Sequence, residues 1–253
     1  MALNMAGKVF LIGAGPGDPE LVTVKAIKTL QAADVILLDD LINRDLLQYA
    51  PQARVVEVGK RGGCKSTPQH FINRMMVALA KQGHTVARLK GGDPLLFGRG
   101  GEEMLVLRAA GIDTEIIPGI TSGIAAPACI GVPVTHRAFT HGVTFVTGHT
   151  QDGASPNWKA LAESGTTLVI YMGMKHLPTI VGDLLKAGMS PDMPAAVIQQ
   201  GSLPQQRHVT STISMLPIAV QQARLTSPAI IVVGHVVRLA QSMHLTTALS
   251  VAA

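Results

Sequence analysis

Aromatic residues are scarce in this chain of 253 residues, at 3% of the composition. Proteins that read RNA or single strands commonly stack bases on aromatic rings, so this scarcity argues against a nucleic-acid partner. Only two cysteines are present, Cys64 and Cys129, which excludes a disulfide framework and leaves no zinc-binding spacing. This cysteine usage is typical of a reducing cytoplasm, where we expect the protein to act.

Long apolar runs and a leader pattern are also missing. The apolar run at residues 229–233 has the length of a strand, far below the ~20 residues of a membrane-spanning helix. The first residues lack the charged region and long apolar stretch of a signal peptide, so we expect a soluble protein with no membrane partner. Charged residues make up only 15%, yet the net charge is +5, which favours anionic ligands.

Apolar segments of strand length alternate with helical patterns along the first half of the chain. Continuous apolar strands separated by helices predict a parallel sheet covered on both faces. One helix is expected to begin at Thr67, with threonine as N-cap and Pro68 at the first helical position. Strands are predicted at 8–12, 34–38, 54–58, 84–89 and 113–117, and helices at 19–33, 67–83, 101–110 and 121–129.

Residues 131–141 interrupt this alternation of strand and helix patterns and mark the expected domain boundary. The predicted fold is α/β with two α/β domains, residues 1–135 and 136–253. Residues 206–213 alternate polar and apolar, which predicts antiparallel strands mixed into the second sheet. In this half, strands are expected near 143–147, 167–171, 194–199, 207–213 and 229–233, and helices near 157–163, 176–187, 214–223 and 235–242.

Polar or glycine-rich segments follow each predicted strand of the first domain. In an open parallel sheet, ligands bind at the carboxyl ends of the strands, so these segments are expected to line one cleft. The segment GAGPGD at residues 13–18 imitates a dinucleotide fingerprint, but Asp18 occupies the position of the last glycine. Asp18 would repel a pyrophosphate, and Pro16 lacks an N–H to bind one. NAD binding is therefore disfavoured, which leaves a tight turn or a ligand without phosphate.

Residues 88–103, RLKGGDPLLFGRGGEE, combine five glycines with six charged residues. So many glycines suggest a backbone that approaches something closely. Asp93 either forms an Asx turn before Pro94 or contacts a ligand. Arg99, between two glycines, either reaches into the cleft or stays solvated. Together with Lys60 and Arg137, it would suit a substrate with several carboxylates, although each cation alone is more often an ordinary surface charge.

Further candidates are short polar or methionine-containing segments. Thr121 and Ser122 begin a helix after a strand, where they cap the helix or bind a ligand through the same N–H groups. Met172, in the segment YMG, either fills the core or packs on an adenine. The histidines show no metal-ligand spacing, so no metal is expected.

Several motifs together resemble the tetrapyrrole methylase family over about residues 7–240. They are GAGPGDPELVTVKA, LLDDLI, VGKRGG, KGGDPLLFGRGGEE, PGITSGIAAPACIGVPVTHR, YMGM and SPAIIVVGHVV. The resemblance implies a homodimer of chains with two α/β domains, which hold S-adenosyl-L-methionine in the cleft between them and release S-adenosyl-L-homocysteine. It further implies methylation of uroporphyrinogen III at carbons 2 and 7, giving precorrin-2 via precorrin-1 for siroheme, cobalamin or heme d1 synthesis.

The resemblance also implies roles for individual residues. Its catalytic positions are Asp39, Lys60 and Arg99, and its substrate-binding positions are Arg99, Glu102 and Arg137. After methyl transfer the macrocycle must lose a proton, and either Asp39 or Arg99 would accept it. An arginine base is unusual because its pKa is so high. The implied cofactor-binding residues are Pro16, Gly91, Gly92, Asp93, Leu96, Thr121, Ser122, Met172, Gly201 and Ala229.

Alternatives from other classes remain open at this stage. One is a dinucleotide-dependent oxidoreductase, and another is a methylase that acts on RNA or protein, which the basic charge permits. Because the chain begins shortly before the resemblance, we expect it to lack the added dehydrogenase–chelatase domain of siroheme synthases.

Overall fold

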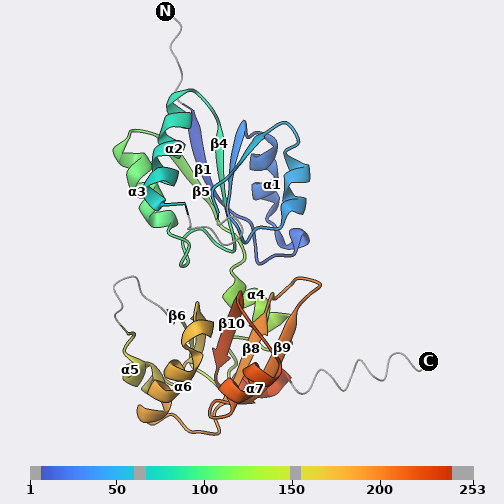
Figure 1. Cartoon of the computed structure of the whole chain (residues 1–253), viewed down its shortest axis with the longest axis vertical. Helices are drawn as coiled ribbons and strands as arrows, with labels where there is room; N and C mark the ends of the chain where they lie inside the picture. The colour runs from blue at the N-terminus through green and yellow to red at the C-terminus, as the bar shows by residue number, and fades with distance from the viewer. Residues whose placement is uncertain (1–6, 60–66, 149–154, 241–253) are drawn as a thin grey trace, which may run out of the picture. The chain divides into compact units, whose positions relative to one another are not determined.

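The computed structural model describes residues 7–59, 67–148 and 155–240 and divides the chain into two compact units, residues 1–121 and 122–253 (Figure 1). The second unit begins with α4 (Ser122–Ala128), which packs against two strands of that unit. The sequence predicted the boundary further along, between residues 135 and 136, because the alternation of strand and helix patterns is interrupted only after this helix. No helix in these described ranges is long and apolar enough to cross a membrane.

The first unit contains a five-stranded sheet in the order β3-β2-β4-β1-β5. All four strand pairings are parallel, so all five carboxyl ends lie at the same edge of the sheet. This confirms the predicted parallel sheet and the shared edge of its strand-end segments. The strands are β1 (Lys8–Gly13), β2 (Val35–Leu38), β3 (Arg54–Glu57), β4 (Val86–Lys90) and β5 (Asp113–Ile117).

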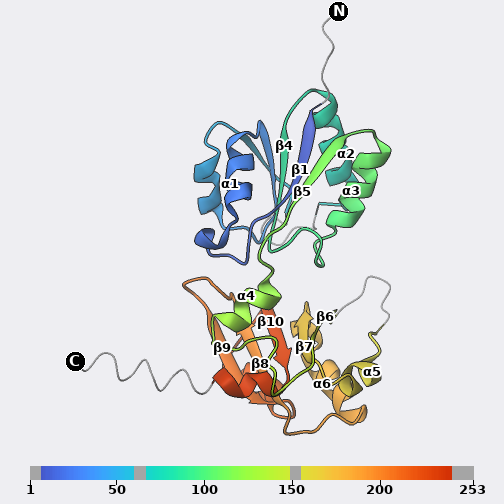
Figure 2. The same cartoon turned by 180° about the vertical axis from the view of Figure 1, so that it is seen from behind.

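Helices cover both faces of this sheet (Figures 1 and 2). Ala26 and Leu30 of α1 (Val24–Gln31) pack in a core with Ile36 and Leu89. On the opposite face, α2 (Gln69–Lys81) and α3 (Gly100–Ala109) pack against side chains of β1, β2 and β4. Successive strand residues therefore point alternately into two aliphatic cores, as the continuous apolar runs predicted.

Two helix starts differ from the sequence prediction. The single helix expected at 19–33 is wrong: a 3-10 helix, η1 (Pro19–Leu21), precedes α1. Asp18 Oδ1 accepts from the Glu20 N–H at 2.9 Å, and Thr23 Oγ1 accepts from the Ala26 N–H at 3.1 Å. Two capping side chains five residues apart each begin their own helix. The predicted cap at Thr67 is also wrong, because Pro68 is the N-cap of α2 and forms no side-chain cap bond.

The second unit contains a mixed five-stranded sheet in the order β6-β7-β10-β8-β9. Strands β6 and β7 are parallel, whereas β10 is antiparallel to β7 and β8, and β8 is antiparallel to β9. The predicted mixed sheet is confirmed. The strands are β6 (Val143–Thr147), β7 (Thr167–Tyr171), β8 (Pro194–Gln199), β9 (Arg207–Thr212) and β10 (Ala229–Val233).

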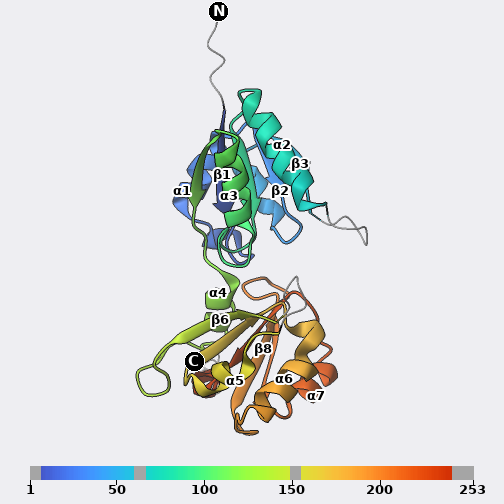
Figure 3. The same ribbon diagram turned by 90° about the vertical axis from the view of Figure 1, so that its left-hand side faces the viewer.

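Three helices, α5 (Trp158–Glu163), α6 (Leu177–Lys186) and α7 (Leu216–Gln222), share one core with this sheet (Figure 3). Ile170 of β7 points into that core, so its neighbour Tyr171 points to the other face, where it meets α4. The helix expected at 235–242 is a 3-10 helix, η4 (His235–Leu239), in the described part of that segment. The remaining 3-10 helices are η2 (Arg44–Tyr49) and η3 (Met174–His176).

Candidate active site

Three loops at the carboxyl edge of the first sheet touch one another through glycine backbone. Gly15 and Gly92 form an isolated antiparallel bridge with N···O distances of 3.2 and 2.7 Å. A Cβ atom on Gly13 would lie 2.5 Å from the Gly119 nitrogen, and a Cβ on Gly119 would lie 2.2 Å from the Gly92 oxygen. Side chains cannot fit at such distances, so the packing of loop on loop requires these glycines.

Asp93 joins two of these loops through its carboxylate. Oδ1 accepts from the Leu95 N–H at 2.8 Å, which is the expected Asx turn, and Oδ2 accepts from the Gly119 N–H at 3.1 Å. Gly91, by contrast, is exposed, and an added Cβ would meet only the Leu41 Cβ, at 3.7 Å. Gly91 is therefore open to a ligand, whereas the neighbouring loops already surround Gly92.

The loop between β4 and α3 is strained and ends on an ion pair. Phe97 and Arg99 have φ values of 53° and 61°, in the left-handed region that side chains disfavour. The Gly100 N–H donates to the Pro94 carbonyl at 2.9 Å and closes the loop. Arg99 then donates twice to Glu102, Nε to Oε1 at 3.0 Å and Nη2 to Oε2 at 2.6 Å. This forked geometry presents a fixed guanidinium at the start of α3.

The ion pair sets the charge of both partners. Hydrogen bonding to Glu102 raises the pKa of Arg99 above its ordinary value, and hydrogen bonding from Arg99 lowers the pKa of Glu102. Both groups are therefore charged at neutral pH. The resemblance implied either Asp39 or Arg99 as the base that accepts a proton from the macrocycle. Arg99 is unsuited to that role, because it is more firmly protonated than an ordinary arginine.

A group of charged residues that the sequence analysis did not single out lies beneath this edge. Arg88, Lys90 and Glu103 are 2%, 3% and 0% exposed. Burial lowers the pKa of Lys90, nearby Arg88 lowers it further, and Glu103 opposes both effects. The available signal was the spacing: two basic residues two apart in an otherwise apolar central strand must share one buried face.

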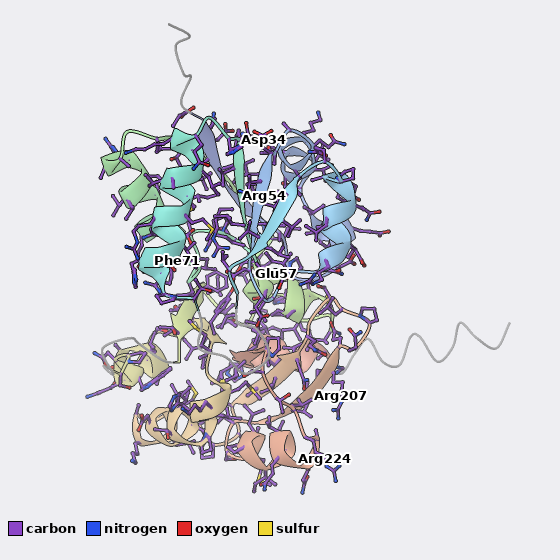
Figure 4. All side chains as sticks on the ribbon, turned by 45° about the horizontal axis from the view of Figure 1, so that its top comes forward. Asp34, Arg54, Glu57, Phe71, Arg207 and Arg224 are labelled. Carbon is purple, nitrogen blue, oxygen red and sulfur yellow. The ribbon has the colours of Figure 1, made fainter. Side chains whose placement is uncertain are left out.

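Asp39 lies directly after β2, at the rim of a small pocket, and its side chain is 38% exposed. Gly59 closes one side of this pocket, where an added Cβ would lie 2.4 Å from the Asp40 nitrogen. Figure 4 shows Glu57 near this end of β3 and Arg54 nearer the opposite end. Lys60 lies outside the described residues. The pocket is lined by Leu38, Asp39, Asp40, Ile42, Arg44, Glu57 and Gly59.

In the second unit, α4 lies directly against two strand ends. The Gly123 N–H donates to the Tyr171 hydroxyl at 2.7 Å, and an added Cβ on Gly201 would lie 2.4 Å from the Ala126 Cβ. Met172 follows Tyr171 with φ 54° and is 53% exposed. An exposed methionine is not core filler, so the first of the two interpretations of Met172 is wrong.

The other predicted residues are distributed over both units. Thr121 is buried, Pro16 and Leu96 are half-buried, and Arg137 is exposed in a turn. Ala229 begins β10 opposite Gln199 of β8. The first unit holds Pro16, Asp39, Gly91, Gly92, Asp93, Leu96, Arg99, Glu102 and Thr121, and the second holds Ser122, Arg137, Met172, Gly201 and Ala229.

Comparison with known families gives a match over most of the chain. A family described as Tetrapyrrole (Corrin/Porphyrin) Methylases matches residues 8–217. A uroporphyrinogen-III C-methyltransferase of Pseudomonas aeruginosa is 53% identical over 234 residues, covering 92% of this chain and 96% of the relative. A siroheme synthase of Thiobacillus denitrificans is 43% identical over 239 residues, and the match covers 94% of this chain but 50% of that protein.

A solved structure shares the fold. The uroporphyrin-III C-methyl transferase of Thermus thermophilus, complexed with S-adenyl homocysteine, superposes with a TM-score of 0.80 at 39% identity. The match covers 92% of this chain and 100% of that chain. The two α/β units, one with a parallel sheet and one with a mixed sheet, are therefore the architecture of that enzyme.

Proposed function

The chain belongs to the tetrapyrrole methylase family, and from that premise we propose that it methylates uroporphyrinogen III with S-adenosyl-L-methionine as methyl donor. The observation that carries the proposal is the 53% identity, over nearly the full length of both chains, to an enzyme named for this reaction. Methylation at carbons 2 and 7, via precorrin-1 to precorrin-2, is the finer form of the proposal. The product would serve siroheme, cobalamin or heme d1 synthesis.

The loop after β1 suits a cofactor without phosphate. Asp18 uses its carboxylate to cap η1, and Pro16 has no N–H, so this turn offers an acid where a phosphate would need donors. S-adenosyl-L-methionine carries no phosphate and supplies, when bound, an electrophilic sulfonium methyl group. The exposed Gly91 backbone and the exposed Met172 side chain are the contacts we assign to it first. The remaining assigned contacts are Pro16, Gly92, Asp93, Leu96, Thr121, Ser122, Gly201 and Ala229.

Charged side chains of the site would bind and orient the macrocycle. Uroporphyrinogen III carries several carboxylates, which suit guanidinium partners. Arg99, fixed by Glu102 and 45% exposed, is proposed to bind one of them, and Arg137 another. Lys60, which lies outside the described residues, is proposed to assist. Orientation of the reacting pyrrole carbon in this way lowers the entropic barrier to transfer.

Asp39 is proposed to accept the proton that leaves the macrocycle. When a pyrrole carbon takes the methyl group from the sulfonium, S-adenosyl-L-homocysteine leaves and the pyrrole ring carries a delocalised positive charge, which is neutralised when the macrocycle loses a proton. Asp39 is a partly exposed carboxylate at the sheet edge, whereas the pair with Glu102 raises the pKa of Arg99. A carboxylate in reach of the ring can therefore act as the general base.

The proposed assembly is a homodimer in the cytoplasm. Neither nucleic acid nor a membrane is part of this proposal, since the few aromatic residues offer little surface for base stacking. Gel filtration with light scattering would test the dimer. A single species of the monomer mass, about 26.5 kDa, would contradict it.

The reaction itself is tested by mass spectrometry. The purified protein would be incubated without oxygen with uroporphyrinogen III and methyl-labelled S-adenosyl-L-methionine. We expect the tetrapyrrole to gain two labelled methyl groups. A tetrapyrrole of unchanged mass, with the cofactor nevertheless bound, would contradict the substrate and retain the cofactor.

A further inference from the structure

Two cations lie on the most protected strand of the first sheet. Strand β4 is central in the order β3-β2-β4-β1-β5, and all five of its residues are buried. Arg88 pairs in register with Leu11 on one side and Leu37 on the other. Since Arg88 and Lys90 are two residues apart, they point to the same face, the face that α2 and α3 cover. Charged groups are placed there only when they are paired.

Glu103 of α3 is the common partner of these cations. Its Oε1 accepts from Arg88 Nε at 3.2 Å, Lys90 Nζ at 3.3 Å and Gln69 Nε2 at 2.9 Å. Its Oε2 lies 3.2 Å from the same Lys90 ammonium without an aligned hydrogen bond. Glu103 is completely buried, so it balances charge inside the core and cannot contact a tetrapyrrole itself.

Arg88 connects this buried group to the candidate base. Its Nη2 donates to Asp39 Oδ2 at 3.0 Å, while Nη1 lies 3.4 Å from the Leu37 carbonyl and 3.3 Å from the Leu89 carbonyl. The guanidinium is thus held by two strands and by Glu103, in a plane that leaves it little freedom. Arg88 is 2% exposed, whereas the Asp39 side chain is 38% exposed.

The Asp39 carboxylate is held at both oxygens. Oδ2 accepts from Arg88, and Oδ1 accepts from the Asp40 N–H at 3.0 Å. The bond from Asp40 is local to the neighbouring residue, whereas the bond from Arg88 ties the carboxylate to the central strand of the sheet. Together the two bonds hold the partly exposed carboxylate in one orientation.

We propose that Arg88, anchored by Glu103, is a positioning residue that fixes the orientation of the Asp39 carboxylate for proton removal. The proposal rests on the proposed function, in which Asp39 accepts the proton. Arg88 touches neither substrate nor cofactor in this assignment, because it is buried. A purely structural role, in which the group only ties α3 to the sheet, would predict damage to folding that is independent of Asp39.

A double-mutant cycle separates the two roles. Arg88→Met in the wild-type background is expected to lower kcat for methylation of uroporphyrinogen III by about 10- to 100-fold, since a displaced catalytic group costs rates of this order. In an Asp39→Asn background the same change is expected to cost less than about 2-fold, because the carboxylate it serves is gone. Arg88→Lys, which keeps the charge but not the planar fork, is expected to recover part of kcat.

Controls separate positioning from folding and from cofactor binding. Arg54→Met removes an exposed arginine of β3 near the opposite end of the sheet from Glu57 and should leave kcat unchanged (Figure 4). The Kd of S-adenosyl-L-homocysteine should stay within about 3-fold in Arg88→Met if cofactor contacts persist. Equal fractional losses of kcat in the wild-type and Asp39→Asn backgrounds would overturn the proposal.

Two further measurements cover the remaining outcomes. If Arg88→Met does not fold, Glu103→Gln keeps the shape of the anchor but not its charge. It should lower kcat several-fold, and only when Asp39 is present. A crystal structure of Arg88→Met, or of Glu103→Gln if only that variant folds, reports the Asp39 orientation directly, even if the wild type does not methylate uroporphyrinogen III and the proposed function fails. An Asp39 carboxylate in the wild-type orientation in the variant studied would refute positioning.

Discussion

Met172 has a backbone conformation that favours glycine, yet the residue is an exposed methionine. Phe97 and Arg99 share this left-handed conformation in the loop after β4, as do Gln200 and Ser202 in the loop after β8. These loops contain residues assigned to the cofactor or the substrate. Strain of this kind persists at functional sites, where a side chain is needed in a direction that relaxed backbone does not allow.

Replacing Met172 should reveal that strain. Met172→Gly is expected to be more stable to urea than Met172→Ala by about 1 kcal/mol, because only glycine adopts this φ without a Cβ penalty. Both variants should weaken binding of S-adenosyl-L-homocysteine, which isothermal titration would measure. An alanine variant as stable as the glycine variant would show that the backbone relaxes without cost.

Arg99 should matter for the substrate and little for the cofactor. Arg99→Ala is expected to lower kcat/KM for uroporphyrinogen III at least 10-fold, because a charge-assisted contact to a carboxylate is lost. The Kd of S-adenosyl-L-homocysteine should change by less than about 3-fold. Arg108→Ala, an exposed arginine in the last turn of the same helix, is the matched control. Equal losses in turnover and cofactor binding would contradict the assignment.

At the scale of elements, adjacent glutamates at the start of α3 should contribute very differently to stability. Glu103→Ala leaves Arg88 and Lys90 buried without their shared anion, and we expect a loss of about 3–5 kcal/mol in the free energy of unfolding. Glu102→Ala removes only an exposed pair with Arg99, worth at most about 1 kcal/mol. Urea unfolding followed by circular dichroism would compare them. Similar losses in both variants would argue against the buried network.

Strands β1 and β5 are joined at their amino ends by charges whose effect depends on pH. Glu115 pairs with Lys25 of α1 and with Lys8, and these hydrogen bonds lower the pKa of Glu115, the one from Lys25 most. Glu115 therefore stabilises the fold above its ordinary pKa of 4.5, and this contribution is lost as the pH falls through its lowered folded pKa.

Glu115→Gln tests this dependence. The variant should unfold at a lower urea concentration than the wild type at pH 7, and the difference should shrink as the pH falls below 4.5. The bond to Glu115 also raises the pKa of Lys8, so that part of the effect should persist until the pH rises through the raised value. A difference that stays constant from pH 7 to acid would point to packing rather than charge.

For the whole molecule, the net charge of +5 should assist a polyanionic substrate and leave the cofactor unaffected. Raising the sodium chloride concentration from about 50 to 500 mM should lower kcat/KM for uroporphyrinogen III by on the order of 10-fold, because salt screens attraction between separated charges. Binding of S-adenosyl-L-homocysteine should be nearly insensitive to salt. Turnover unaffected by salt would indicate recognition through shape alone.

Much of the architecture was predictable because several strands, such as β2, β7 and β10, are nearly uninterrupted aliphatic runs. The strands β5, β6, β7, β8 and β10 lie at the predicted residues, and the apolar runs of β7, β8 and β10 are the kind that a covered sheet buries. The helix starts were less accessible, because Thr23 begins α1 only once the chain has turned at η1. Residues 235–239 form a 3-10 helix, although their apolar pattern fits an α-helix equally well.

The candidate site was only partly predictable, because sequence gives the edge of a sheet but not what lies under it. The strand-end segments were expected to meet, and those within the described residues do. The charges of Arg88, Lys90 and Glu103 were noted in the segment 88–103, but their burial as one group was not expected, because its members come from a strand and from the start of the next helix. Contacts between residues of different elements, such as β4 and α3, are set by packing rather than by the local sequence pattern.

The contact of Gly13, Gly92 and Gly119 has a consequence for protein engineering. Since each backbone fills the space that a side chain of its neighbour would need, no one of the three loops can be redesigned alone. A graft intended to alter specificity would have to transplant residues 13–17, 91–93 and 118–121 as one cassette. For the same reason, a substitution at Gly13, Gly92 or Gly119 would be tolerated, if at all, only together with changes in the two neighbouring loops.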